Sequence, residues 1–189
     1  MQFSSVEKKD LLKSWVVLSI AFAILMSRPL NFASFLYNFL VSGLTVGISF
    51  LFHELGHKYL AQRYNCWAEY RSFDFMLIIA LAMSFFGFIF AAPGAVMIHG
   101  QLTKSKYGKI SAMGPLINIV LAGIFLALLY IGISNSIMFY GFYINSLLAV
   151  FNMIPFWNFD GLKIWKWSKP AYLSMLLVSI FFIVVSNAI

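Results

Sequence analysis

The sequence is poor in charged residues, and that scarcity limits the kind of protein it encodes. Only 10% of its 189 residues are Asp, Glu, Lys or Arg, whereas soluble domains carry about 25%. Hydrophobic residues make up 62%, well above the usual level of about 45–50%. A soluble core cannot bury this excess, so lipid is the expected solvent. These proportions exclude a soluble globular protein and favour one membrane-embedded domain over residues 1–189.

Acidic residues and cysteine are also scarce. Only 6 Asp and Glu accompany 13 Lys and Arg, which gives a net charge of +7. In a soluble protein this balance would suggest nucleic-acid binding. Here the basic residues lie in short gaps between apolar runs, which is a pattern typical of membrane topology, so no nucleic-acid partner is expected. Cys66 is the only cysteine, which excludes an internal disulfide.

Apolar residues gather into segments that are candidates for crossing or entering the membrane. A helix needs about 20 residues to cross the hydrocarbon, and most of the segments approach or exceed that length. They are Leu11–Met26, Asn31–Tyr59, Phe73–Ile98, Ile110–Ile133, Ile137–Pro155 and Pro170–Ile189. The composition therefore predicts an all-α polytopic membrane protein with about five to six transmembrane helices.

The segment Phe73–Ile98 is predicted to enter the membrane and return on the same side. It is interrupted by Pro93 and Gly94, residues that break helices. If every segment crossed, Lys and Arg would divide almost evenly between the two sides. If this segment returns, every basic residue except Arg28 faces the cytoplasm, which the positive-inside rule favours. We therefore predict five crossing helices, one re-entrant element and a cytoplasmic N-terminus.

Residues 53–57 form the pattern H-E-x-x-H near the end of the second apolar segment. Residues four apart share one face of a helix, so His53 and His57 are predicted to bind one metal ion. Glu54 is rotated about 100° from His53, and its longer side chain suits a general base acting on water beside the ion. The alternative is a set of hydrogen-bonded core residues, but ionisable groups clustered in an apolar segment are costly and are functional by default.

A catalytic zinc site needs a third protein ligand and an open position. The remaining candidates are His99, Glu69, Asp74 and Asp160. Glu69 and Asp74 lie in a charged stretch, where solvated surface is the simpler interpretation, and an interfacial position explains His99. Asp160 follows the fifth segment, which runs parallel to the second in the predicted topology. Both segments then end near the cytoplasm, and we predict Asp160 as the third ligand.

Asn118 is a further candidate for the catalytic site. It lies one turn after Gly114 and Pro115, which are placed near the start of the fourth segment. Proline is tolerated in the first turn of a helix, and glycine allows another backbone to approach. Asn118 either orients a catalytic group or hydrogen-bonds a neighbouring helix.

The stretch Pro93–Gly100 is short, apolar and bounded by glycine, which is typical of a β-strand. A loop that closes the re-entrant element is the alternative. As a strand near the active site, Gly94, Ala95 and Val96 would bind the substrate by pairing with its extended backbone.

Three motifs in this order resemble a known family. They are His53–His57, Gly114–Asn118, and Asn152 followed by Pro155, Asp160 and Gly161. Together they resemble the site-2 proteases, which are zinc enzymes that cleave within membranes. The resemblance covers roughly residues 44–163, the expected catalytic core. Unlike larger members of that family, this sequence has no stretch for a PDZ domain, and its apolar segment between the first two motifs is long.

The resemblance implies a role for each motif residue. His53, His57 and Asp160 hold zinc, Glu54 is the catalytic base, and Asn152 positions the substrate or stabilises the oxyanion. It also implies a catalytic centre near the cytoplasmic face.

We therefore expect a zinc metalloendopeptidase of regulated intramembrane proteolysis. It would hydrolyse transmembrane protein or peptide substrates near the cytoplasmic side of a prokaryotic cell membrane, with Zn²⁺ as cofactor and the lipid bilayer as surroundings. One alternative is another H-E-x-x-H protease, whose third ligand would be Glu69. The others are a non-catalytic metal-binding membrane protein and a pseudoprotease that binds transmembrane segments without cutting them.

Overall fold

Helices dominate the fold. The computed structural model describes residues 1–29, 31–89, 92–133, 136–156 and 158–189. The elements are α1 (Ser5–Met26), α2 (Phe32–Ser42), the π-helical turn η1 (Gly43–Gly47), α3 (Ile48–Arg63), β1 (Trp67–Ser72), α4 (Asp74–Phe86), β2 (Gly94–His99), α5 (Lys104–Tyr130), α6 (Ser136–Asn152), α7 (Asp160–Trp167) and α8 (Lys169–Ser186). The predicted helical class is supported, with a small antiparallel sheet in addition.

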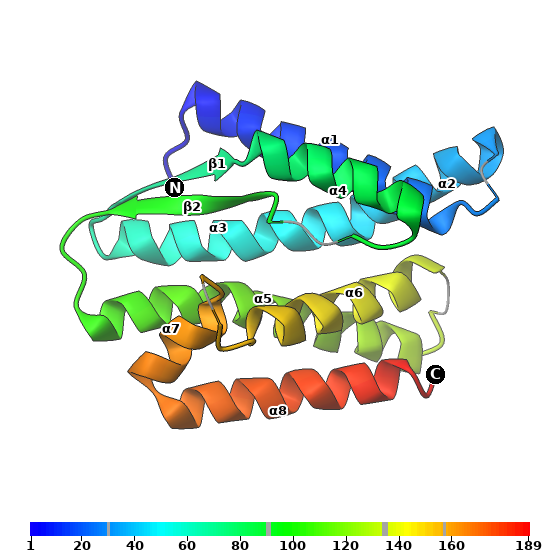
Figure 1. Cartoon of the computed structure of the whole chain (residues 1–189). Helices are drawn as coiled ribbons and strands as arrows, with labels where there is room; N and C mark the ends of the chain where they lie inside the picture. The colour runs from blue at the N-terminus through cyan, green and yellow to red at the C-terminus, as the bar shows by residue number, and fades with distance from the viewer. Residues whose placement is uncertain (30, 90–91, 134–135, 157) are drawn as a thin grey trace.

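The elements stack around α3 (Figure 1). Helices α1 and α4 lie on one side with the sheet, while α5, α6 and then α8 lie on the other. Helix α3 packs against α5 and also contacts both strands, and the short α7 packs against α5 and α8. The helix that carries His53 and His57 therefore lies between the sheet and the rest of the bundle.

Three helical stretches are long and apolar enough to cross a membrane in the part of the chain that the structure describes. They are Phe32–Arg63, Lys104–Tyr130 and Lys169–Ser186. Helices α4 and α6 are apolar but shorter, and α1 begins with a cluster of charged residues. The structure thus supports fewer spans, by length and composition, than the five to six that were predicted.

The segment predicted as re-entrant leaves the sheet and rejoins it at the same point. Ser72, the last residue of β1, pairs with Gly94, the first residue of β2. Helix α4 lies between these residues, and residues 90 and 91 lie outside the described part of the chain. Because Ser72 and Gly94 are paired, the chain that enters α4 and the chain that begins β2 lie side by side.

Strand β1 corrects the interpretation of the stretch around Glu69 as solvated surface. Ala68 and Tyr70 are buried, while Glu69 is half-buried and forms an ion pair with Arg71. The alternation of buried and less buried residues is the period of two that a strand imposes. Charged residues alternate with apolar ones in this six-residue strand. The sequence therefore contains no continuous apolar run that would indicate it.

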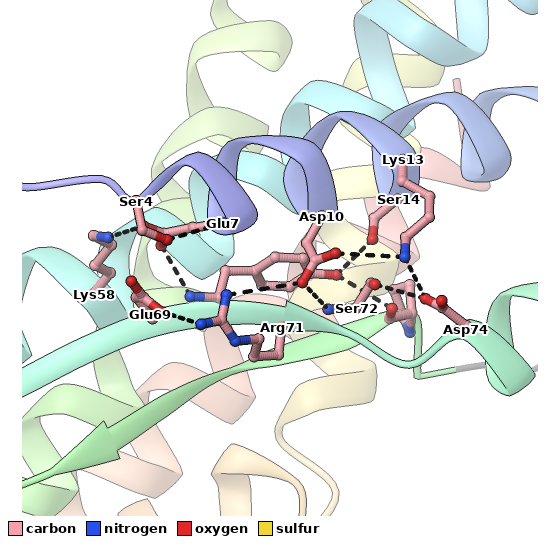
Figure 2. Close-up of polar contacts among 12 residues, drawn as sticks. Ser4, Glu7, Asp10, Lys13, Ser14, Lys58, Glu69, Arg71, Ser72 and Asp74 are labelled. Carbon is pink, nitrogen blue, oxygen red and sulfur yellow. Dashed lines mark hydrogen bonds and ion pairs between the residues drawn. The ribbon is translucent and has the colours of Figure 1, made fainter.

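A buried ion pair joins α1 to α3 (Figure 2). The carboxylate of Glu7 contacts the ammonium of Lys58, and both side chains are fully buried. The second oxygen of Glu7 accepts a hydrogen bond of 2.9 Å from the backbone nitrogen of Tyr70 in β1. Lys58 therefore points into the protein, where Glu7 neutralises its charge.

Further polar contacts extend this α1–β1 interface. Ser14 and Tyr70 share a hydrogen bond of 2.8 Å between their hydroxyl oxygens. Lys13 lies 2.5 Å from a carboxylate oxygen of Asp74 at the start of α4. Asp74 is exposed, as its interpretation as a surface residue predicts. Both buried and exposed polar contacts therefore connect α1 to β1 and α4.

We expect Lys58→Met to lower the free energy of unfolding by about 3–5 kcal/mol, because it leaves the buried Glu7 carboxylate without a counter-charge. The double variant Glu7→Leu with Lys58→Met removes both charges and should recover much of that loss. Denaturant unfolding of the full chain in detergent measures both values. Asp74→Asn, at an exposed ion pair, serves as a control that should change stability little. A single variant as stable as the unsubstituted protein would contradict this role of the pair.

Candidate metal centre

The two histidines of α3 direct one ring nitrogen each toward a common point. His53 and His57 are buried, and their Nε2 atoms lie 3.1 Å apart. Four residues make about one helical turn, which places both rings on the same face of α3. The spacing predicted from the sequence is therefore realised as a pair of converging nitrogens.

Asp160 completes the cluster from α7. Its Oδ2 lies 3.0 Å from His57 Nε2 and 3.4 Å from His53 Nε2. Asp160 is the first residue of α7, and the following Gly161 packs so tightly that a Cβ there would collide with the backbone of Met153, the residue after α6. This tight return of the chain brings the carboxylate to the histidines.

The opposite ring nitrogens of the histidines have acceptor partners. His57 Nδ1 lies 2.8 Å from the carbonyl oxygen of Ile110, and His53 Nδ1 lies 2.5 Å from Oδ1 of Asn118. A carbonyl oxygen only accepts hydrogen bonds, so each Nδ1 donates and each neutral imidazole keeps its lone pair on Nε2. Histidine ligands of metals are held in the same way, with the other ring nitrogen donating to an oxygen.

Three electron-pair donors thus face one another, which is an arrangement that a cation stabilises. Asp160 ligates a metal ion as its ionised carboxylate, and the histidines ligate it as neutral rings. Tetrahedral zinc with bonds of about 2.0–2.1 Å places its ligand atoms about 3.3 Å apart, which matches the separations of 3.0, 3.1 and 3.4 Å.

Helix α5 packs directly on this donor set. A Cβ at Gly114 would lie 2.5 Å from His53 Nε2 and would also collide with His57 Nε2. A close approach at Gly114 was expected from a neighbouring backbone, whereas the structure places two histidine side chains there. The placement of Gly114 in the first helical turn is wrong, because α5 begins at Lys104 and Pro115 lies inside the helix. The first residues of α5, from Lys104 to Lys109, are mostly polar, so the apolar pattern predicts a start that is too late.

Glu54 and Lys163 lie next to the metal-binding residues in the sequence or in space. Glu54 follows His53 in α3 and is 8% exposed. Lys163, one turn into α7, places its Nζ 3.5 Å from Oδ1 of Asp160. Sequence reasoning missed Lys163, although its spacing of three residues from Asp160 on a helix is typical of a local ion pair.

A buried polar network surrounds Asn118. Its Nδ2 lies 3.0 Å from Oδ1 of Asn145 on α6, and Asn145 Nδ2 lies 2.7 Å from the hydroxyl oxygen of Ser49 on α3. Asn118 and Asn145 are both fully buried. Asn145 was missed from the sequence, and the signal that would have found it is an amide in the middle of an apolar segment.

The remaining candidates lie outside the donor set. Asn152, the last residue of α6, is half-buried and donates a hydrogen bond of 2.9 Å to the Leu148 carbonyl oxygen. His99 is exposed and packs against the ring of Trp67, with ring centroids 5.0 Å apart. Glu69 forms its ion pair with Arg71 and is no ligand. In the described residues, His53, His57 and Asp160 form the group able to hold a metal ion.

The predicted substrate-binding residues occupy one strand. Gly94, Ala95 and Val96 open β2 and pair with Ser72, Arg71 and Tyr70 of β1. Strand β2 contacts α3, the helix that carries the two histidines. The predicted strand is therefore present and lies against the metal-binding helix.

Comparison with known proteins gives one relative. The chain shares 42% identity over 173 residues with a protein of Methanocaldococcus jannaschii named "Putative zinc metalloprotease". The match covers 88% of this chain and 87% of that protein. No protein-family model and no solved structure matches the chain. The buried donor set and the name of this relative both point to zinc as the cofactor.

We expect Gly114→Ala to abolish metal binding, because the added methyl group would occupy the space beside both Nε2 atoms. Zinc measured in the purified chain should fall from about one ion per chain to nearly none. Gly123→Ala on the same helix is the matched control, since its Cβ would meet only Phe182 at 3.8 Å. Full zinc occupancy in Gly114→Ala would show that α5 does not close on the donor set in this way.

Proposed function

Since this chain belongs to a family of zinc metalloproteases, we propose that it is an intramembrane protease of the site-2 type that hydrolyses peptide bonds of transmembrane substrates. The observation that carries the proposal is the meeting of His53, His57 and Asp160 around one point, with Glu54 beside them on the same helix. Three protein ligands with one open position are the composition of a catalytic zinc site, whereas structural zinc sites are closed by four.

The proposed mechanism is metal-assisted hydrolysis, with zinc held by His53, His57 and Asp160. Bound zinc supplies a Lewis acid that polarises a carbonyl group and lowers the pKa of water. Glu54 accepts the proton of the attacking water and passes it to the leaving amine. The buried position of Glu54 keeps bulk water from competing for that proton.

Two elements are proposed to bind the substrate. Strand β2 has one edge paired with β1, and its other edge has no strand partner in the described residues. An extended substrate segment would add to this free edge at Gly94, Ala95 and Val96 through backbone hydrogen bonds. Asn152 retains a second amide N–H beyond the one bonded to Leu148, and it would position the scissile carbonyl or stabilise the oxyanion.

The membrane is the proposed site of action. Large apolar side chains are exposed on several helices, including Phe75 at 73% and Phe86 at 79% on α4 and Leu177 at 66% on α8. Lipid removes the free-energy cost of exposing these groups to water. We propose a multi-pass protein of a prokaryotic cell membrane, with a cytoplasmic N-terminus, a re-entrant α4–β2 element and a role in regulated intramembrane proteolysis.

We expect Glu54→Gln to keep its zinc while losing cleavage by about 10²–10⁴-fold, the usual contribution of a positioned acid or base. The assay incubates the purified chain in detergent or vesicles with a single-span protein and follows the products on a gel. Asp74→Asn, which also neutralises one carboxylate but at an exposed site, should cleave normally. Undiminished cleavage by Glu54→Gln would remove the proposed base.

Zinc content separates Asp160 from the rival glutamate. Asp160→Ala should strongly reduce the zinc bound, because it removes one of three protein ligands. Glu69→Ala should retain zinc, since Glu69 lies at the ion pair with Arg71. Elemental analysis of both purified variants is the measurement. Loss of zinc from Glu69→Ala with retention in Asp160→Ala would reverse the assignment.

A further inference from the structure

Asn145 lies at the centre of a chain of hydrogen bonds that leads to the metal centre. It projects from α6, is fully buried and contacts residues of three helices. Its Nδ2 lies 2.8 Å from the Gly141 carbonyl oxygen and 2.7 Å from Ser49 Oγ, while its Oδ1 lies 3.0 Å from Nδ2 of Asn118. None of these atoms belongs to the donor set itself, so the role of Asn145 lies in what it does to its neighbours.

The orientation of the Asn145 amide is set by an atom that only accepts hydrogen bonds. The carbonyl oxygen of Gly141 has no hydrogen to give, so the amide nitrogen of Asn145 must face it. The amide oxygen of Asn145 then faces Asn118. If this side chain were flipped, its oxygen would face the Gly141 carbonyl oxygen and its NH2 group would face the NH2 group of Asn118, so neither buried contact would be a hydrogen bond.

The orientation of the Asn145 amide in turn determines that of the Asn118 amide. Facing the oxygen of Asn145, Asn118 must present its amide nitrogen, which also lies 3.5 Å from the Ser49 carbonyl oxygen. Its own oxygen is left for His53 Nδ1, at 2.5 Å. His53 therefore carries its hydrogen on Nδ1, and the lone pair on Nε2 points to the donor set.

We infer that Asn145 is a positioning residue for the zinc site, acting through Asn118 to hold His53 in the tautomer and ring orientation that bind the ion. The inference rests on the proposed metal site, and it adds a residue of α6 to the groups that orient the metal ligands. His57 is oriented differently, since its Nδ1 donates directly to a backbone carbonyl that cannot flip. Of the two histidines, only His53 depends on side-chain amides whose direction must itself be fixed.

The test compares zinc affinities of full-length variants in detergent, measured by competition with a chromophoric chelator. Asn145→Leu keeps a similar volume but no longer holds the Asn118 amide, and it should weaken zinc binding about 10-fold or more, the usual effect of losing a partner behind a metal ligand. As a neutral acid, the form that burial favours, Asn145→Asp donates to the Gly141 carbonyl oxygen, accepts from Asn118 Nδ2 and should recover part of the affinity. Ser146→Ala is the matched control, because Ser146 is the next residue, is equally buried and donates its hydroxyl hydrogen to the Phe142 carbonyl oxygen of its own helix.

A double-variant cycle separates positioning from general destabilisation. If Asn145 acts through Asn118, Asn118→Leu alone and Asn118→Leu with Asn145→Leu should have zinc affinities within about twofold of each other, whereas independent effects would multiply. The visible spectrum of the Co²⁺-substituted chain gives a second readout. Asn145→Leu should change its bands and Ser146→Ala should leave them unchanged, even if both variants unfold at similar temperatures.

The outcomes distinguish this inference from the proposed function. If the unsubstituted chain binds no zinc, both are overturned. If it binds zinc stoichiometrically and Asn145→Leu has the same affinity and the same Co²⁺ spectrum, the inference alone is overturned. Equal losses in Asn145→Leu and Asn145→Asp, or multiplicative effects in the cycle, would also overturn it, because they would indicate a structural role without orientation of Asn118.

Discussion

Two imidazole lone pairs and a carboxylate oxygen within 3.0–3.4 Å of one another repel unless a cation lies among them, and the fold is arranged around that constraint. The ring orientation of each histidine is fixed on the side away from the donor set, because its Nδ1 donates a hydrogen bond to an oxygen of α5. The carboxylate is held by the first turn of α7 and by the tight return of the chain at Gly161. Binding of the ion therefore requires little rearrangement of the chain, which is the basis of preorganised catalysis.

Helix α5 supplies the common surface for both histidines. Ile110, Gly114 and Asn118 follow one another at intervals of four residues and so lie along one face. Ile110 offers the oxygen for His57, Gly114 gives room for both rings, and Asn118 offers the oxygen for His53. One face of α5 thus orients both histidine rings, which residues next to the histidines in the sequence cannot do.

The sequence predicted the parts of the site that local geometry or topology controls. The pairing of His53 with His57 follows from helical spacing, and the arrival of Asp160 follows from two parallel segments that end on the same side. Asn145 and Lys58 were not recognised, because their roles depend on which distant side chain meets them. Strand β1 was missed for a related reason, since its charged residues are stabilised by partners elsewhere in the chain and look like surface residues in isolation.

The pair of Glu7 and Lys58 has a consequence for the order in which the molecule is assembled. Lys58 follows His57 directly, so the helix that binds the metal carries a buried cation of its own. Among the described residues its counter-charge is Glu7 in the first turn of α1, which is separated from it by about fifty residues of chain. The final environment of the metal-binding helix is therefore complete only when α1 has docked against it.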